Sequence, residues 1–151
     1  MTYGDIARAL TKTLTDLFPG HRIYSMARVE KIERPAFFFS MKPVLVEAAN
    51  MRTRHNVLSV YIDYFQSVKD EAGMYDAATV IRDTLGWSYP VGDHYVNVQS
   101  FDWEFVGTER NVIEISITLD YFDAVDTDEK ADLMEDVHVN VETEDPVGKP
   151  L

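Results

Sequence analysis

The sequence of 151 residues contains no cysteine. Disulfide bridges, thiolate-bound zinc, iron–sulfur clusters and cysteine nucleophiles are therefore excluded. Because cysteine usage is the usual sign of an oxidising or a reducing environment, its absence leaves the redox compartment open.

Basic residues are few. Lys and Arg together number 14 against 26 Asp and Glu, which gives a formal net charge of -12. The excess is concentrated at the end of the chain, where residues 120–151 hold 11 acidic residues against only Lys130 and Lys149. Tight binding to nucleic acid needs clustered Lys and Arg, so it is disfavoured. An acidic wall past which DNA slides without sticking is still compatible with this charge.

Long hydrophobic runs are also missing. No window approaches the roughly 20 apolar residues of a membrane span, and the N-terminus lacks the basic-then-apolar order of a signal peptide. We therefore expect a soluble protein that is made in the cytoplasm and has no membrane partner. Hydrophobic residues nonetheless make up 46% of the chain and aromatic residues 12%. That is enough apolar side chain for one folded core.

Helical spacing of apolar residues occurs twice. Residues 5–18 carry Ile6, Leu10 and Leu14 on one stripe and end at Pro19-Gly20. Residues 74–85 repeat the pattern and are followed by Gly86, a typical residue after a helix end. The sequence therefore predicts two amphipathic helices, each with one buried face.

Alternating apolar and polar residues predict strands, in which Leu58 and Ile62 share one face and Asp63 and Glu114 face outward. The predicted strands are residues 23–26, 37–46, 56–65, 95–106 and 112–122. Pro43 is expected to bulge the second strand or to confine it to a sheet edge. Residues 87–93 read as a turn-rich connection, and residues 107–111 as a hairpin loop.

The element order, α-β-β-β-α-β-β, predicts an α+β fold. We expect a mainly antiparallel sheet of about five strands with two helices packed on one face, plus an acidic C-terminal extension. Residues 1–123 are predicted to form the core domain. Residues 124–151, where acidic residues crowd, are predicted to be a tail that orders only when docked on a partner.

Residues that could carry chemistry are scattered. The four histidines stand singly, without the spacing of a helical metal site. The acidic run Asp120, Asp123, Asp126 and Asp128 lacks the order of a calcium loop, so we expect a solvated charge run and no bound metal. No nucleophile elbow or phosphate-binding glycine loop occurs, and Asp102 with Glu104 should face solvent on one strand. We expect neither an enzyme nor a cofactor.

Aromatic residues populate both faces of the predicted strands, more than one face of a small sheet needs. We expect the second face to be covered by a neighbouring subunit. In the tail, Leu133 and Met134 could anchor in a groove, and the alternating valines could add a strand to another sheet edge. The candidate subunit or partner interface residues are Phe38, Arg52, Arg54, Tyr61, Phe65, Leu133, Met134, Val137, Val139 and Val141.

The N-terminal amphipathic helix, the short strand at Ile23-Tyr24, the segment Arg34-Pro35-Ala36-Phe37-Phe38-Phe39 and the strand end Tyr61-Ile62-Asp63-Tyr64-Phe65 form a familiar pattern. It resembles the tail terminator (tail completion) proteins of long-tailed phages and phage-like elements. The likeness covers roughly the first 125 residues.

The resemblance implies a structural protein of a virion tail or phage-like particle, assembled in the host bacterial cytoplasm. It implies a ring of identical subunits, typically a hexamer, that caps the tail tube protein, stops its polymerisation and meets the head connector or head-closure protein. DNA would pass through the ring without tight binding. The alternatives are another neck, head-closure or baseplate protein, and, from a different class, a small hydrolase or metal-dependent accessory enzyme.

Overall fold

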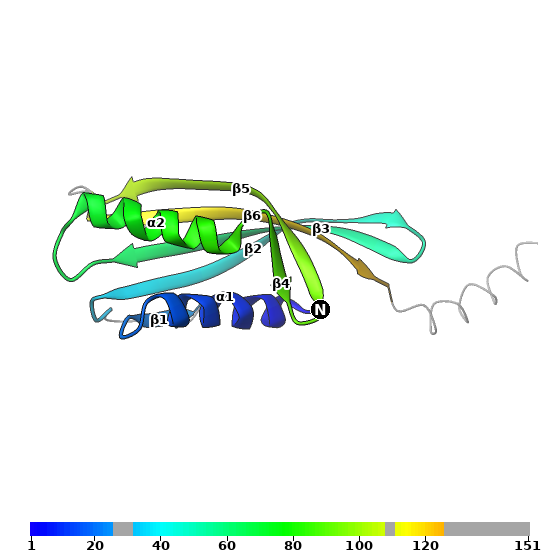
Figure 1. The fold of residues 1–151 in the computed structure, drawn as a ribbon. Helices are drawn as coiled ribbons and strands as arrows, with labels where there is room; N and C mark the ends of the chain where they lie inside the picture. The colour runs from blue at the N-terminus through cyan, green and yellow to red at the C-terminus, as the bar shows by residue number, and fades with distance from the viewer. Residues whose placement is uncertain (26–31, 108–110, 126–151) are drawn as a thin grey trace, which may run out of the picture.

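The computed structural model describes residues 1–25, 32–107 and 111–125. Two helices cover one side of a six-stranded sheet with the strand order β1-β2-β3-β6-β5-β4 (Figure 1). The elements, in chain order, are α1 (Tyr3–Leu17), β1 (Arg22–Ser25), β2 (Ala36–Asn50), β3 (Thr53–Phe65), α2 (Glu71–Leu85), β4 (Ser88–Val91), β5 (His94–Val106) and β6 (Val112–Ala124).

Helix α1 begins at a capping box. The Thr2 hydroxyl accepts a hydrogen bond from the Asp5 N–H at 3.1 Å, and the Asp5 carboxylate accepts one from the Thr2 N–H at 2.8 Å. Both bonds satisfy backbone donors that a helix start leaves unpaired. The predicted stripe is confirmed, since Ile6, Leu10 and Leu14 are the buried residues of this helix.

Helix α2 begins at Glu71, three residues before the predicted start. Its buried face includes Met74, Ala78, Ile81 and Leu85, as the spacing indicated. Gly86 follows with a positive φ of 61°, a backbone conformation that side chains with a Cβ rarely adopt. This glycine therefore turns the chain out of the helix and into β4.

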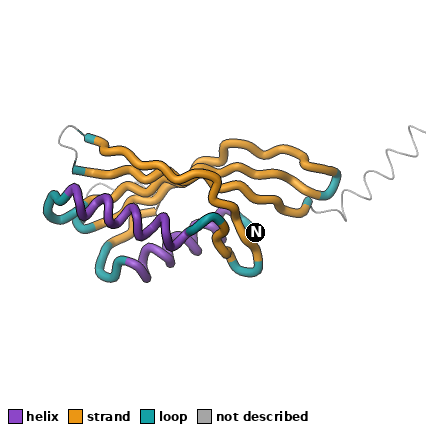
Figure 2. Tube along the Cα trace, turned by 45° about the horizontal axis from the view of Figure 1, so that its top comes forward, coloured by secondary structure: helices purple, strands orange, loops and turns teal. Residues whose placement is uncertain are grey.

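The sheet buries the face that the alternation predicted. Strand β3 turns Leu58, Val60 and Ile62 inward, and its antiparallel register sets Ile62 beside Ile115 of β6. Figure 2 shows both helices on this one side of the strands. The α+β class and the packing of two helices on one face are thus confirmed, and the apolar layer between helices and sheet is the core.

The expectation of a mainly antiparallel sheet of about five strands needs two corrections. The sheet has six strands, because Ser88–Val91, expected as part of a turn, forms the short edge strand β4. The sheet is also mixed, since β1 pairs with β2 in parallel. A four-residue strand that contains Pro90 has too little alternation to be recognised, and alternation carries no information about strand direction.

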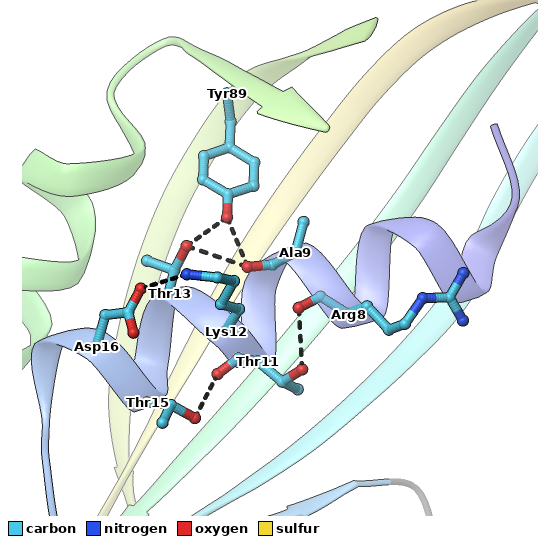
Figure 3. A network of polar contacts seen from close by, with 8 residues as sticks. All are labelled: Arg8, Ala9, Thr11, Lys12, Thr13, Thr15, Asp16 and Tyr89. Carbon is cyan, nitrogen blue, oxygen red and sulfur yellow. Dashed lines mark hydrogen bonds and ion pairs between the residues drawn. The ribbon is translucent and has the colours of Figure 1, made fainter. Parts of the chain in front are cut away.

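Strand β4 holds α1 in place. The Tyr89 hydroxyl, at the end of a buried side chain, donates to the Ala9 carbonyl at 2.8 Å and also bonds the Thr13 hydroxyl (Figure 3). The Thr13 hydroxyl also lies 3.1 Å from the same carbonyl oxygen, so the two hydroxyl protons are shared among three close pairs of oxygen atoms. This network ties the missed strand to the first helix.

Three strands extend past the helices at one end of the sheet (Figures 1 and 2). We call this part the arm and define it as Val44–Asn50 of β2, the turn residues Met51 and Arg52, Thr53–Asn56 of β3 and Tyr121–Ala124 of β6. It begins at the bulge predicted from Pro43, where the register shifts between Pro43 and Leu45 and leaves Val44 as the extra residue. Without helices beneath it, the arm leaves every β2 residue in it exposed.

Candidate assembly surface

The arm exposes apolar side chains that a folded subunit normally buries. Met51, at the turn between β2 and β3, is 73% exposed, and Phe122 is 56% exposed. Val44, Leu45 and Val46 are also exposed, although all three lie in a strand. Clustered exposed apolar residues mark contact surfaces in soluble proteins. The arm is therefore a candidate for contact with another protein.

Polar pairs hold the arm in shape. The Arg54 guanidinium donates two hydrogen bonds to the Asp123 carboxylate, at 3.2 and 2.7 Å, across the β3–β6 pairing. Asn56 donates a third to the same carboxylate at 2.8 Å. Burial acts to raise the pKa of Asp123, but these bonds outweigh it and leave the pKa below its ordinary value. The predicted interface residue Arg54 therefore forms its hydrogen bonds with Asp123 of its own chain.

His55 lies on the opposite face of the arm, between two carboxylates. Its Nδ1 is 3.1 Å from Glu47 Oε1 and its Nε2 is 3.3 Å from Asp120 Oδ2, while its ring stacks on Phe122 with centroids 4.9 Å apart. The hydrogen bond with Glu47, and then that with Asp120, raises the pKa of His55. The arm thus has bonded side chains on both faces.

The side of the sheet away from the helices is called the open face here. Phe38, Tyr61 and Phe65, three of the predicted interface residues, lie on it and are half-buried by their strand neighbours. The Arg34 guanidinium lies over the Phe65 ring, 5.2 Å from its centroid. Aromatic residues therefore lie on this second face of the sheet as well, as the sequence predicted.

Two carboxyl groups face each other on the open face. Asp63 of β3 pairs directly with Glu114 of β6, which pairs in turn with Glu104 of β5. Burial, together with a hydrogen bond and charge repulsion from Glu114, raises the pKa of Asp63 from its ordinary value of 3.8 to about 7. Sequence alternation placed Asp63 and Glu114 on the outer faces of their strands, but only the cross-strand register shows that they meet.

The structure separates the predicted interface residues into groups. Phe38, Tyr61 and Phe65 gather on the open face, whereas Arg52 lies at the arm's turn and Arg54 on the arm's helix side. The remaining five, from the tail, lie outside the described residues: Leu133, Met134, Val137, Val139 and Val141. Of the arm, only Arg52 and Arg54 were among the predicted residues. Its exposed apolar residues were missed, because the sequence does not show where the helices stop covering the sheet.

Among the described residues, no group of three or more His, Asp or Glu side chains could hold a metal ion. No helix there is long and apolar enough to span a membrane. Asp102 and Glu104 are both exposed on the open face, as the alternation predicted, rather than lining a cleft.

Comparison with known proteins identifies the family. A family model described as phage tail terminator protein matches residues 5–131. The chain belongs to the phage tail terminator family. This match spans both helices and all six strands, so the resemblance in the first 125 residues is confirmed.

Solved structures add support for the fold of this tail terminator. One, which has no descriptive name, aligns with a TM-score of 0.50 and 14% identity over 83% of this chain and 96% of that one. At this identity the likeness concerns the fold alone. The search of curated proteins found no significant match. Family membership makes the chain a structural component of a phage tail, in a family that is not enzymatic.

Proposed function

We propose that this tail terminator forms a ring of identical subunits, a hexamer, that caps the tail tube and joins it to the head connector. The observation that carries the proposal is the arm, whose exposed Met51 and Phe122 have no cover in a single subunit. Burial of such side chains against a neighbouring subunit or the tube protein stabilises an assembly. A head-to-tail contact closes into a ring when the rotation per subunit divides the circle.

The charge supports a role around DNA. Asp63, Glu104 and Glu114 lie next to one another on the open face of the sheet, and the whole chain carries -12. In the proposed ring, an acidic inner surface would repel the phosphate backbone, so DNA would pass without adhering. Strong retention of duplex DNA by the purified ring at about 0.15 M salt would contradict this role.

We also propose a division of the chain near residue 123. Residues 1–123 would form the folded subunit, and residues 124–151 would dock on a neighbour or partner. Leu133 and Met134 would serve as anchors, and Val137, Val139 and Val141 would pair along a sheet edge. The first half is supported to within two residues of this boundary, because β6 ends at Ala124 and the Val125 N–H bonds the Arg52 carbonyl at 2.9 Å.

The test combines mass measurement with tube assembly. Light scattering and electron microscopy of the purified chain, alone and with tube protein, should show closed rings, and added protein should stop tube elongation. Met51→Asp should weaken both ring formation and the arrest of tube elongation, because it puts a charge where apolar burial is expected. Val68→Asp is the matched control, since Val68 is 78% exposed but lies outside the arm, between β3 and α2.

A chain that stays monomeric at every concentration, with and without tube protein, would overturn the ring. Equal loss of assembly in Met51→Asp and Val68→Asp would show that the arm has no special part in it.

A further inference from the structure

The two edge strands, β1 and β4, are much shorter than the strands they pair with, β2 and β5. Long stretches of β2 and β5 therefore have no neighbour on their outer side in the part of the chain that the structure describes. Strand β1 covers β2 only at Ala36–Phe39, and β4 covers β5 only at His94–Asn97. The Val98 N–H still bonds the Trp87 carbonyl at 2.9 Å. Among the described residues, β2 from Ser40 onward and β5 from Gln99 onward therefore have no strand on their outer side. Such edges present unpaired N–H and C=O groups that can pair with another chain. We propose that β5 of one subunit pairs with β2 of the next, which rests on the proposed ring and names its contact.

Strand direction fits this contact. The four long strands β2, β3, β6 and β5 lie side by side and are antiparallel at each step. Rotation about a ring axis leaves the direction of each strand along that axis unchanged. The β2 strand of the next copy would thus run antiparallel to β5, and the alternation would continue from subunit to subunit. The two edges differ, as a head-to-tail contact requires.

On the helix side of the sheet, the apolar side chains at the β5 edge are only partly covered. Phe101 and Trp103 pack edge to face with centroids 5.8 Å apart, yet Trp103 remains 36% exposed. A pocket of about 200 Å³ lies beside them, lined by Arg82, Asp83, Gly86, Trp87, Val98 and Phe101. Met41 lies on the helix side of β2 and is only partly buried. A neighbouring β2 would bring this apolar side chain toward Phe101 and Trp103.

Charges on the open face favour β2 over a second β5 as the occupant. Asp102 and Glu104 are exposed on β5, and Lys42 is exposed on β2 without an ion pair among the described residues. Pairing β5 with β2 brings the lysine near these carboxylates. Pairing two β5 strands would bring carboxylates together, which destabilises a sheet.

The register of the existing sheet gives a starting alignment. Lys42 pairs with Ser59, Ser59 with Thr118, and Thr118 with Ser100, so these four residues lie in one row across the sheet. Without a shift along the strands, Lys42 of the next subunit would lie opposite Ser100. Shifts of two and four residues would bring it opposite Asp102 and Glu104 on the same face.

Disulfide cross-linking tests the contact cleanly, because the chain has no cysteine of its own. Lys42→Cys is combined in one chain with Ser100→Cys, Asp102→Cys or Glu104→Cys, oxidised after assembly and run on a non-reducing gel. We expect at least one pair to give a ladder of linked subunits. Within one subunit these positions are three strands apart, roughly 14 Å, which is beyond disulfide reach.

Lys42→Cys with Thr118→Cys is the matched control. Thr118 lies in the same row as Ser100 but one strand further from the edge, about 10 Å from an adjoining β2, so no ladder should form. Rings that assemble while none of the three test pairs cross-links would overturn the edge contact and leave the ring intact. Cross-linking of the single variant Asp102→Cys, without Lys42→Cys, would show that two β5 edges meet. That result would also overturn the pairing of β5 with β2. A chain that never assembles refutes the ring and this contact together.

Discussion

Replacement of Asp63 by asparagine should stabilise the isolated subunit above neutral pH. Asp63 is half-buried opposite Glu114, and burial with that carboxyl beside it raises its pKa from 3.8 to about 7. Between these pH values the folded chain holds a proton that the unfolded chain has lost. The free energy of unfolding therefore falls as pH rises through this window, by up to about 1.36 kcal/mol per pH unit.

The full window of about 3 pH units sets an upper bound of roughly 4 kcal/mol on this destabilisation. Water screens a half-exposed carboxylate, so we expect about 1–2 kcal/mol in practice. Asp63→Asn removes the charge with little change in shape. It should therefore raise the free energy of unfolding by about 1–2 kcal/mol at pH 8 and by clearly less at pH 5.

Urea unfolding of dilute, monomeric protein, followed by tryptophan fluorescence at pH 5 and pH 8, measures both values. Asp76→Asn is the control, since Asp76 is exposed on α2 and away from the open face. Glu114→Gln should act in the same direction as Asp63→Asn, because it removes the facing carboxylate. If Asp63→Asn is neutral or destabilising at pH 8, the two carboxyl groups do not repel each other in the folded chain and the reasoning fails.

Three further outcomes are expected. Tyr89→Phe should lower the free energy of unfolding by about 1 kcal/mol in urea titrations, because the Thr13 hydroxyl can donate to the carbonyl that Tyr89 leaves; no loss would mean that this network is not stabilising. Asp123→Ala should speed amide hydrogen exchange in the arm while melting of the core stays nearly unchanged, since its bonds with Arg54 lie beyond the helices. Truncation after Val125 should leave melting nearly unchanged and weaken ring formation measured by light scattering; a truncated chain that cannot fold would place the tail in the core.

Local patterns predicted the core well. Helix spacing identified the buried face of α1, and alternation placed Leu58 and Ile62 inward because one face of β3 packs on the helices. These features depend on neighbours a few residues apart, so the sequence contains them directly. The bulge near Pro43 could be predicted for the same reason, since proline cannot continue a regular ladder.

Features that depend on distant residues could not be predicted. The meeting of Asp63 with Glu114 requires the register between strands that are far apart in the chain. Strand β4 depends on Tyr89 reaching across to α1, a contact that leaves no pattern around Ser88–Val91. The exposure of Val46 follows from where the helices end relative to the sheet. Each of these is a property of the assembled layers and not of a segment.

The bulge at Val44 also decides which side chains the arm presents on each face. Before it, odd-numbered residues of β2 such as Phe39 point toward the helices, whereas after it even-numbered residues such as Val46 share that side. Val44 is the extra residue, so deleting it would leave Leu45 opposite Val57 and would keep both faces of the arm as they are. A one-residue deletion at this point is therefore a change of length that strand pairing can absorb. The same deletion in a regular stretch of β3 would turn every following side chain to the opposite face.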